Sequence, residues 1–251
     1  MESHSNFLRG SFLAIVAVVV IGIFPIGALA APAADLVVQQ RTTVPPNSVL
    51  GKTYQQWSAD WWRWALTIPS SEHPALDNGE DCGASPTSGV WFVAASVLTH
   101  DVIERACDVP LGSRVFFPVV TTEADGVGIA PPPSVPALRD RAALPINRAR
   151  DLLVQIDGQV VPDVSLAGPY RIRSNAFRYS YPATSILCAI RSCGVTSYEE
   201  AGGTVPTAVS DGVFIMTLPL DAGDHTIRFG GDLPSLGRRV EANYTITVRP
   251  R

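Results

Sequence analysis

Residues 53–69 of the chain read TYQQWSADWWRWALTIP, and this stretch decides the fold. It contains four of the five tryptophans in a sequence of 251 residues. Thr53, followed three residues later by Gln56, forms a capping-box pattern, in which the two side chains satisfy backbone N–H groups at the start of a helix. Pro69 sets the other limit, because the residue before a proline is disfavoured in the α region. The stretch therefore predicts one helix between Thr53 and Pro69.

One face of this predicted helix is almost entirely apolar. The side chains that recur on it at three- and four-residue steps are Tyr54, Trp57, Trp61, Trp64, Ala65 and Ile68. Trp62 lies beside this face, roughly 80–140° around the helix from its centre. An ordinary amphipathic helix does not need an apolar surface of this width, so the additional indole requires an explanation.

Two interpretations account for the aromatic surface. In the first, the helix closes an open end or face of a β-sheet, and each aromatic side chain buries about 150–250 Å². In the second, some indoles stay exposed and stack on a ligand such as a sugar ring; the candidates are Trp62 first, then Trp57 and Trp61, with Asp60 beside them. A tryptophan stripe at helical spacing belongs to the core more often than to a binding site, so the first interpretation is favoured.

The first 30 residues have the pattern of an export signal. Arg9 precedes an apolar run over residues 12–24, Pro25 breaks this run, and an Ala-Leu-Ala site ends at Ala30. An uncleaved membrane anchor is the alternative, because about 20 apolar residues can span a bilayer. The helix breakers favour cleavage after Ala30. The chain is therefore predicted to be secreted or periplasmic, and to contact a membrane only if the signal stays attached.

The composition limits what the exported chain can do. The formal net charge is −4 at pH 7, and the arginines are scattered rather than clustered, so a nucleic-acid-binding function is not expected. Residues 31–251 suffice for one β domain with a full core. Nothing in the sequence predicts a cofactor.

Four cysteines remain after export, an even number in an oxidising compartment. Three pairings are possible, and proximity in the sequence favours Cys82 with Cys107 and Cys188 with Cys193. A metal site is the alternative, but the C-x4-C spacing of the second pair has no matching partner pair, and histidines are few. Disulfides are the favoured interpretation.

Most of the sequence after the helix has the pattern of strands and turns. Residues 89–95 (GVWFVAA) and 114–121 (RVFFPVVT) are short apolar runs typical of buried strands, and they are interpreted as a hairpin. Pro118 implies an edge position or a bulge in the second run. Farther along, an Asp-Gly turn at Gly158 predicts a second hairpin. Residues 213–229, which include a DAGD turn, predict a third.

These segments divide the chain into three predicted parts after the signal. Residues 31–121 contain the Trp-rich helix and the first strands. Residues 122–150 contain a Pro/Gly-rich loop and a short helix from residue 137. Residues 151–251 contain the strands of a sandwich. The three parts are expected to form one compact domain. The predicted fold is mainly β: an immunoglobulin- or jelly-roll-like β-sandwich with an N-terminal Trp-rich α-helix packed on it.

Several segments together carry a resemblance that covers most of the mature chain. They are WSADWWRWALTIP, GEDCG, GVWFVAA, CDVPLGSRVFFPVV and SDGVFIMTLPLDAGDHTIRF. Their combination resembles a family of exported bacterial proteins of unknown function. The resemblance implies a shared fold and the Cys82–Cys107 pair, but no activity. The Cys188–Cys193 pair is not part of the family pattern and rests on spacing alone.

Two further groups of residues could carry chemistry. Asp77, Glu80 and Asp81 place three carboxylates in one Gly-containing loop, as calcium sites do, but their spacing does not match an EF-hand, and an acidic solvated loop is favoured. The histidines of the exported chain, His73, His100 and His225, could serve a hydrolase, but no serine lies in a G-x-S-x-G elbow. We therefore expect no catalytic histidine, and we expect His73 and His225 to hold backbone groups.

The sequence supports three hypotheses of function. The first is a non-enzymatic exported β-sandwich that binds a ligand or partner, such as a carbohydrate or a cell-envelope component. The second is a secreted carbohydrate-active or other hydrolase, with carboxylates supplied by Asp60 and the 77–81 loop. The third is a structural component of the cell surface or matrix.

Overall fold

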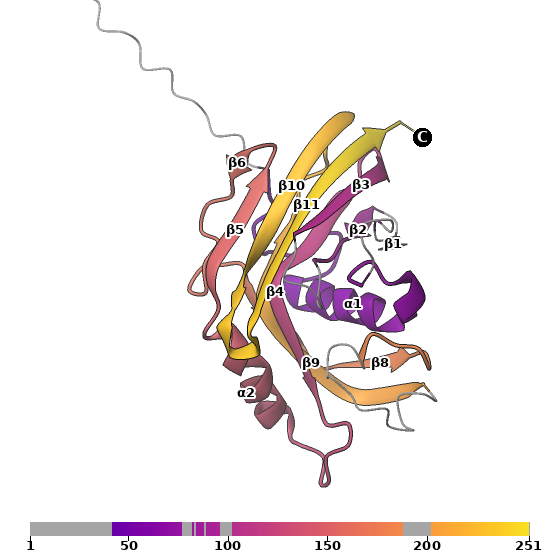
Figure 1. The fold of residues 1–251 in the computed structure, drawn as a ribbon, viewed down its shortest axis with the longest axis vertical. Helices are drawn as coiled ribbons and strands as arrows, with labels where there is room; N and C mark the ends of the chain where they lie inside the picture. Colours follow the sequence, from indigo (N-terminus) through magenta and orange to yellow (C-terminus); the bar gives the residue numbers. More distant parts are fainter. Residues whose placement is uncertain are drawn as a thin grey trace, which may run out of the picture. The chain divides into compact units, whose positions relative to one another are not determined.

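The computed structural model describes residues 42–76, 82, 84–87 (as backbone), 89–95, 102–187 and 202–250. All of them belong to one compact unit, Gln40–Arg251. Two β-sheets pack on each other, and α1 (Tyr54–Thr67) covers the opposite side of one of them (Figure 1). The predicted β-sandwich with a packed helix is confirmed. The predicted signal peptide, residues 1–30, lies outside the described residues.

The first sheet is the one that α1 covers. Its strands are β1 (Ala84–Thr87), β2 (Val90–Phe92), β4 (Arg114–Asp125), β7 (Arg171–Arg173), β8 (Phe177–Tyr181) and β9 (Gly203–Met216). Their order is β1-β2-β4-β9-β7, and β8 also pairs with β9. β2 and β4 run parallel, whereas the other neighbours run antiparallel.

The second sheet packs against the other face of the first. Its strands are β3 (Ile103–Pro110), β5 (Arg150–Ile156), β6 (Gln159–Val160), β10 (Gly223–Leu233) and β11 (Arg238–Arg249). Their order is β3-β11-β10-β5-β6, with β3 parallel to β11. The predicted Asp-Gly hairpin is confirmed: it joins β5 to β6, with φ of 51° at Asp157 and 75° at Gly158, as a type I′ turn requires.

Two predicted hairpins are wrong. Residues 90–92 and 114–116 pair side by side, but in parallel, because the chain crosses to the second sheet and forms β3 between them. Residues 213–216 belong to β9 in the first sheet, whereas β10 lies in the second and forms its hairpin with β11 through η2 (Pro234–Leu236). Apolar runs and turn residues identify buried strands, but they do not identify which strand is the partner.

β4 and β9 form the centre of the molecule, because both of their faces are buried. Phe117 of β4 packs between the sheets, where its ring centroid lies 4.4 Å from that of Phe229. The preceding residue, Phe116, points the other way and lies under α1, 5.7 Å from the ring of Tyr54. The register shifts between Pro118 and Val120. Of the two explanations predicted for Pro118, an edge position or a bulge, the structure shows the bulge.

α1 begins and ends where the sequence predicts. The Thr53 side chain accepts a hydrogen bond from the Gln56 backbone N–H, and the Gln56 side chain accepts one from the Thr53 N–H, so the capping box is confirmed. Ile68, the residue before Pro69, is extended. None of the described helices is long and apolar enough to cross a membrane.

The predicted loop and helix of residues 122–150 differ from the structure in their bounds. β4 continues to Asp125, into the predicted loop, because its pairing with β9 continues to Ala208. α2 (Val135–Ile146) then begins at a Ser134 N-cap and contains Pro145 in its last turn. It packs against β4 and β9 beyond the area that α1 covers (Figure 1).

The disulfide between Cys82 and Cys107 confirms one of the two predicted bridges. The two Cα atoms lie 5.5 Å apart, which is a normal separation for a disulfide. Cys107 lies in β3 of the second sheet, so the bridge ties that sheet to the segment that precedes the first strands. Cys188 and Cys193 lie outside the described residues.

Candidate functional site: the Trp62 pocket

The aromatic face of α1 is core. Trp57, Trp61, Trp62 and Trp64 are only 2%, 4%, 6% and 7% exposed. The indole N–H of Trp57 donates to the Val49 carbonyl and that of Trp61 to the Val93 carbonyl, each at 3.0 Å. The interpretation of the helix as a core element is confirmed. Two cavities of the described part of the chain lie beside α1; Trp62 lines the larger of them, whereas Trp57 and Trp61 line neither.

That larger cavity, which we call the Trp62 pocket, has a volume of about 590 Å³. It lies where α1, the end of β4, α2 and the β10–β11 hairpin meet. Its apolar side chains besides Trp62 are Ala124, Val127, Pro145, Leu187, Leu233, Leu236 and Val240. Its polar side chains are Thr121, Thr122, Glu123, Asp125, Arg141 and Arg238. The pocket therefore combines an apolar wall with several polar groups, as small-molecule sites do.

A hydrogen-bonded chain holds Trp62 at the pocket. Its indole N–H donates to the Thr121 hydroxyl at 3.2 Å, and that hydroxyl donates to the backbone carbonyl of Asp211 at 3.2 Å. Gly212 lies opposite Thr121 in β9, and a Cβ there would lie 2.6 Å from the Val120 carbonyl oxygen and 2.7 Å from Thr121 Oγ1. The glycine therefore leaves the space in which Thr121 meets the indole.

Two carboxylates of β4 lie in the pocket. Glu123 and Asp125 are two residues apart on one strand, so their side chains leave the same face of the sheet. Asp125 is buried; one of its oxygens accepts from the Tyr179 hydroxyl at 2.6 Å and the other from the Val127 backbone N–H at 2.9 Å. These bonds fix the carboxylate at the base of the loop that follows β4.

An arginine of α2 also lines the pocket. Arg141 is exposed, and its Nη1 lies 3.5 Å from the backbone carbonyl oxygen of Asp125. Within the part of the chain that the structure describes, its guanidinium makes no ion pair.

The second cavity, about 300 Å³, holds Asp60. One carboxylate oxygen of Asp60 accepts from Lys52 Nζ at 2.7 Å and the other from Arg63 Nη1 at 2.6 Å. Lys52 Nζ also lies 4.7 Å from the centre of the Trp57 ring, and the Arg63 guanidinium lies 5.5 Å from that of Phe177. Asp60 is thus held between two cations and does not line the Trp62 pocket.

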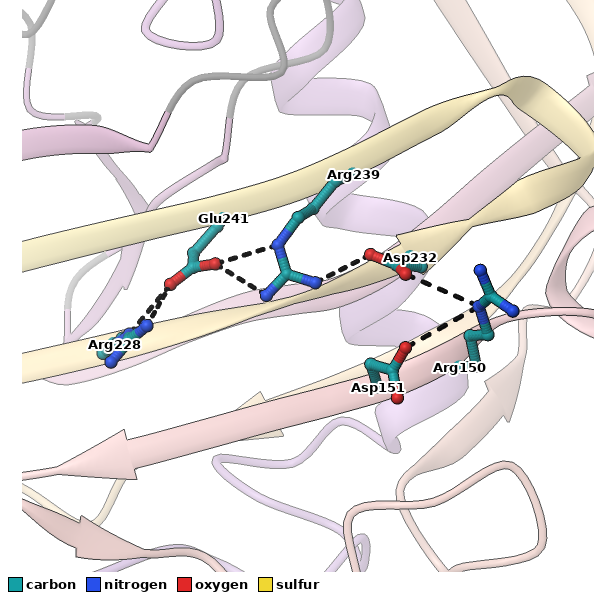
Figure 2. Close-up of polar contacts among 6 residues, drawn as sticks. All are labelled: Arg150, Asp151, Arg228, Asp232, Arg239 and Glu241. Atoms are coloured by element: carbon teal, nitrogen blue, oxygen red, sulfur yellow. Dashed lines mark hydrogen bonds and ion pairs between the residues drawn. The ribbon is translucent and has the colours of Figure 1, made fainter.

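The outer face of the second sheet carries an ion-pair network centred on Glu241 (Figure 2). Its members, which we call the Glu241 network, are Arg150, Asp151, Arg228, Asp232, Arg239 and Glu241. Glu241 is 5% exposed, and each of its oxygens accepts from one arginine: Oε1 from Arg228 Nη2 at 2.6 Å and Oε2 from Arg239 Nη2 at 2.8 Å. Arg239 also donates to Asp232 at 2.7 Å.

The network shifts the ionisation of its members. Burial by itself would raise the pKa of Glu241, but hydrogen bonds from Arg228 and Arg239 outweigh it and lower that pKa. The hydrogen bond from Arg239 lowers the pKa of Asp232, and the two carboxylates raise the pKa of Arg239. All three groups therefore remain charged over a wide pH range. This arrangement holds strands β10 and β11 together and lines neither cavity.

Both described histidines hold backbone groups, as expected. His73 is buried; its Nε2 lies 2.7 Å from the Ala65 carbonyl oxygen, and its Nδ1 accepts from the Ala75 N–H at 3.0 Å. His225 contacts the Asp221 carbonyl at 3.1 Å and Asp157 at 2.8 Å. Burial by itself would lower the pKa of His225, but these hydrogen bonds raise it above its ordinary value.

The predicted calcium ligands Asp77, Glu80 and Asp81 lie outside the described residues, as does His100. Among the residues that the structure does describe, no three His, Cys, Asp or Glu side chains are grouped so that they could hold a metal ion.

Sequence reasoning identified Trp62 but missed the residues around it. The only local indication is the sequence TTEAD at residues 121–125, where polar side chains follow a strongly apolar strand. Arg141 and the residues of the β10–β11 hairpin come from distant parts of the chain and give no such indication.

Comparison with known proteins does not assign this chain to a group. No protein-family model matches it, and no curated protein sequence matches it either. The resemblance to exported bacterial proteins of unknown function stays a prediction, and the function has to be inferred from the site.

Proposed function

We propose that this is an exported, non-enzymatic binding protein that holds a saccharide in the Trp62 pocket. The observation that carries the proposal is the meeting of an indole, an apolar wall and several hydrogen-bonding side chains in one cavity of about 590 Å³. Cavities of roughly 300–1,000 Å³ with this mixture are typical of small-molecule sites. The sequence features of export and the disulfide suit a protein that meets its ligand outside the cytoplasm.

The side chains of the pocket match the surface of a sugar ring. A sugar ring has an apolar face and a rim of hydroxyl groups. Trp62 and the leucines can contact the apolar face, while Thr122, Glu123 and Arg141 can exchange hydrogen bonds with hydroxyls. The lining contains two acidic and two basic side chains, so its formal charge balances.

Calorimetric titration of the oxidised, exported protein tests this proposal. The probes are oligosaccharides of glucose, of N-acetylglucosamine and of glucuronic acid. We expect saturable binding of at least one probe, and Trp62→Phe should weaken it about five- to tenfold because part of the aromatic contact is lost. Trp64→Phe is the matched control, because Trp64 is equally buried on the same helix but does not line the pocket. Failure of every probe to bind, or equal effects of the two substitutions, would contradict the proposal.

A carbohydrate hydrolase is the second candidate, and the two carboxylates on β4 favour it. The Cα atoms of residues two apart on a strand lie about 6.5 Å apart, so two carboxyl groups on the same face can reach the ~5–9.5 Å separation of the paired carboxylates of glycosidases. Asp125 is already held by Tyr179 and the Val127 N–H, which favours binding over catalysis. A turnover on a bound probe that Glu123→Gln abolishes while binding persists would establish the hydrolase.

A further inference from the structure

We infer that the saccharide of the Trp62 pocket is acidic, and that Arg141 binds its carboxylate. The ligand class is a sugar that carries a uronic acid. This inference rests on the proposed function, because it assumes that the pocket binds a saccharide, and it names the group that would select among saccharides.

Arg141 carries a positive charge that no carboxylate of the described residues neutralises. Among the described residues, Arg141 makes one hydrogen bond, a long one of 3.5 Å to the Asp125 carbonyl oxygen, and has no carboxylate partner. Arg171 and Arg239, by contrast, each have a close carboxylate partner: Arg171 lies 2.9 Å from Asp211, and Arg239 lies 2.8 Å from Glu241. A guanidinium presents a planar fork of N–H donors that matches a carboxylate.

The other charged side chains of the pocket are already engaged within the protein. Asp125 accepts hydrogen bonds on both of its oxygens. Glu123 and Arg238 each have an interaction partner within the molecule. The formal charges of the lining sum to zero, but three of the four charged side chains have partners within the protein. The positive charge of Arg141 is therefore the one that is still available to a ligand.

The position of Arg141 fits an acidic group at the edge of a sugar ring. Arg141 is exposed on α2, one turn before Pro145, which belongs to the apolar wall. Leu236, which also lines the pocket, is 44% exposed, so this side of the pocket is open to solvent. The guanidinium thus lies at the rim, whereas the buried indole of Trp62 lies deeper. The carboxylate of a uronic acid projects from the ring, so the ring can contact the apolar wall while the carboxylate reaches the rim.

The test compares an acidic probe with its neutral homologue. A glucuronic acid oligosaccharide and the glucose oligosaccharide of the same linkage are titrated into wild type, Arg141→Gln and Arg139→Gln. We expect the acidic probe to bind about tenfold more tightly to wild type, because one carboxylate–guanidinium pair at a partly exposed site contributes that much. Arg141→Gln should remove this preference and change the affinity for the neutral probe less than about twofold. Arg139→Gln should leave both affinities unchanged.

Arg139 is the matched control because it lies on the same helix and removes the same charge, but it does not line the pocket. Arg141→Lys keeps the charge without the fork, so it should retain part of the preference. An unchanged melting temperature shows that the variants are folded, as expected for an exposed side chain. Equal affinity for both probes, or a preference that survives Arg141→Gln, would overturn this inference and leave the proposed function intact. If neither probe binds, this inference fails, whereas the proposed function fails only if the N-acetylglucosamine oligosaccharide does not bind either.

Discussion

The hydroxyl of Thr121 connects the aromatic helix to the centre of the first sheet. It accepts a hydrogen bond from Trp62 and donates one to the backbone of Asp211, so a single oxygen joins α1, β4 and β9. Because Trp62 is only 6% exposed, water cannot easily replace this acceptor. The contact therefore fixes the indole that borders the pocket.

Thr121→Val should lower the free energy of unfolding by about 1–3 kcal/mol, because it leaves the buried indole N–H without an acceptor. Urea unfolding measures the change. Adding Trp62→Phe should cost less than the sum of the two single substitutions, since both partners are then removed. Thr245→Val, on the exposed side of β11, serves as the control and should have little effect. Strictly additive effects of Thr121→Val and Trp62→Phe would show that the hydrogen bond is not stabilising.

Glu241 makes the stability of the protein depend on acid. Its pKa is lower in the folded protein than the value of about 4.3 expected for an unfolded chain. The stabilisation is therefore complete above the unfolded pKa, and it is lost as the pH falls through the folded pKa.

Glu241→Gln should cost about 1–2 kcal/mol at pH 7, less than a fully buried ion pair would, because Arg228 and Arg239 are partly exposed. The variant should also lose less stability than wild type between about pH 5 and pH 3. Urea midpoints over that range measure both effects. Glu72→Gln, at an exposed position, is the control. A variant whose acid dependence matches that of wild type would show that the pKa of Glu241 is the same in the folded and the unfolded protein.

α1 is the element that could be predicted almost completely from the sequence. Its start, its end and its buried face depend on local signals: a capping box, a proline and a helical period. The strands could be located but not paired. Apolar runs such as residues 114–120 indicate burial on both sides, yet the parallel pairing of β2 with β4 and the separation of β9 from β10 depend on contacts between distant segments.

Thr53→Ala tests the contribution of the cap to this helix. We expect a loss of about 1 kcal/mol, because the Gln56 backbone N–H loses its acceptor. Thermal unfolding followed by circular dichroism gives the measurement. Gln55→Ala, in the same first turn and exposed, should be neutral or slightly stabilising, since alanine is the best helix former. An equal loss from both substitutions would argue against the cap.

The whole molecule has two cores that share β4 and β9, one between the sheets and one under α1. Because the shared strands contribute to both, we expect the two cores to unfold together. The disulfide adds a covalent tie across this arrangement, since it joins β3 of the second sheet to the segment that leads into the first.

Replacing both Cys82 and Cys107 by serine should lower the free energy of unfolding by about 3.5 kcal/mol, the loop entropy expected for a bridge across 25 residues. The transition should stay cooperative. Trp91, whose indole N–H donates to the Cys82 carbonyl at 3.3 Å, reports on the local effect through its fluorescence. A variant as stable as the oxidised protein would mean that the bridge does not constrain the unfolded chain.

The pocket is the feature that the sequence predicted least. Trp62 could be singled out because it departs from the helical stripe, but its neighbours come from β4, α2 and the β10–β11 hairpin. Periodicity describes one element at a time, so it contains no information on which side chains of different elements meet. Asp60 shows the converse: it was a candidate ligand contact, and the structure places it between Lys52 and Arg63, beside a different cavity.

Fluorine NMR of protein labelled with 5-fluorotryptophan tests the central claim most directly, because the chain contains only five tryptophans. Single Trp→Phe variants assign the resonances, and the oligosaccharide that binds in calorimetry is then titrated into the labelled protein. We predict that the Trp62 resonance shifts saturably and most strongly, while that of Trp57, which lies in the core, stays in place. A saturable shift confined to other tryptophans, or no shift with any saccharide, would contradict a saccharide site at Trp62.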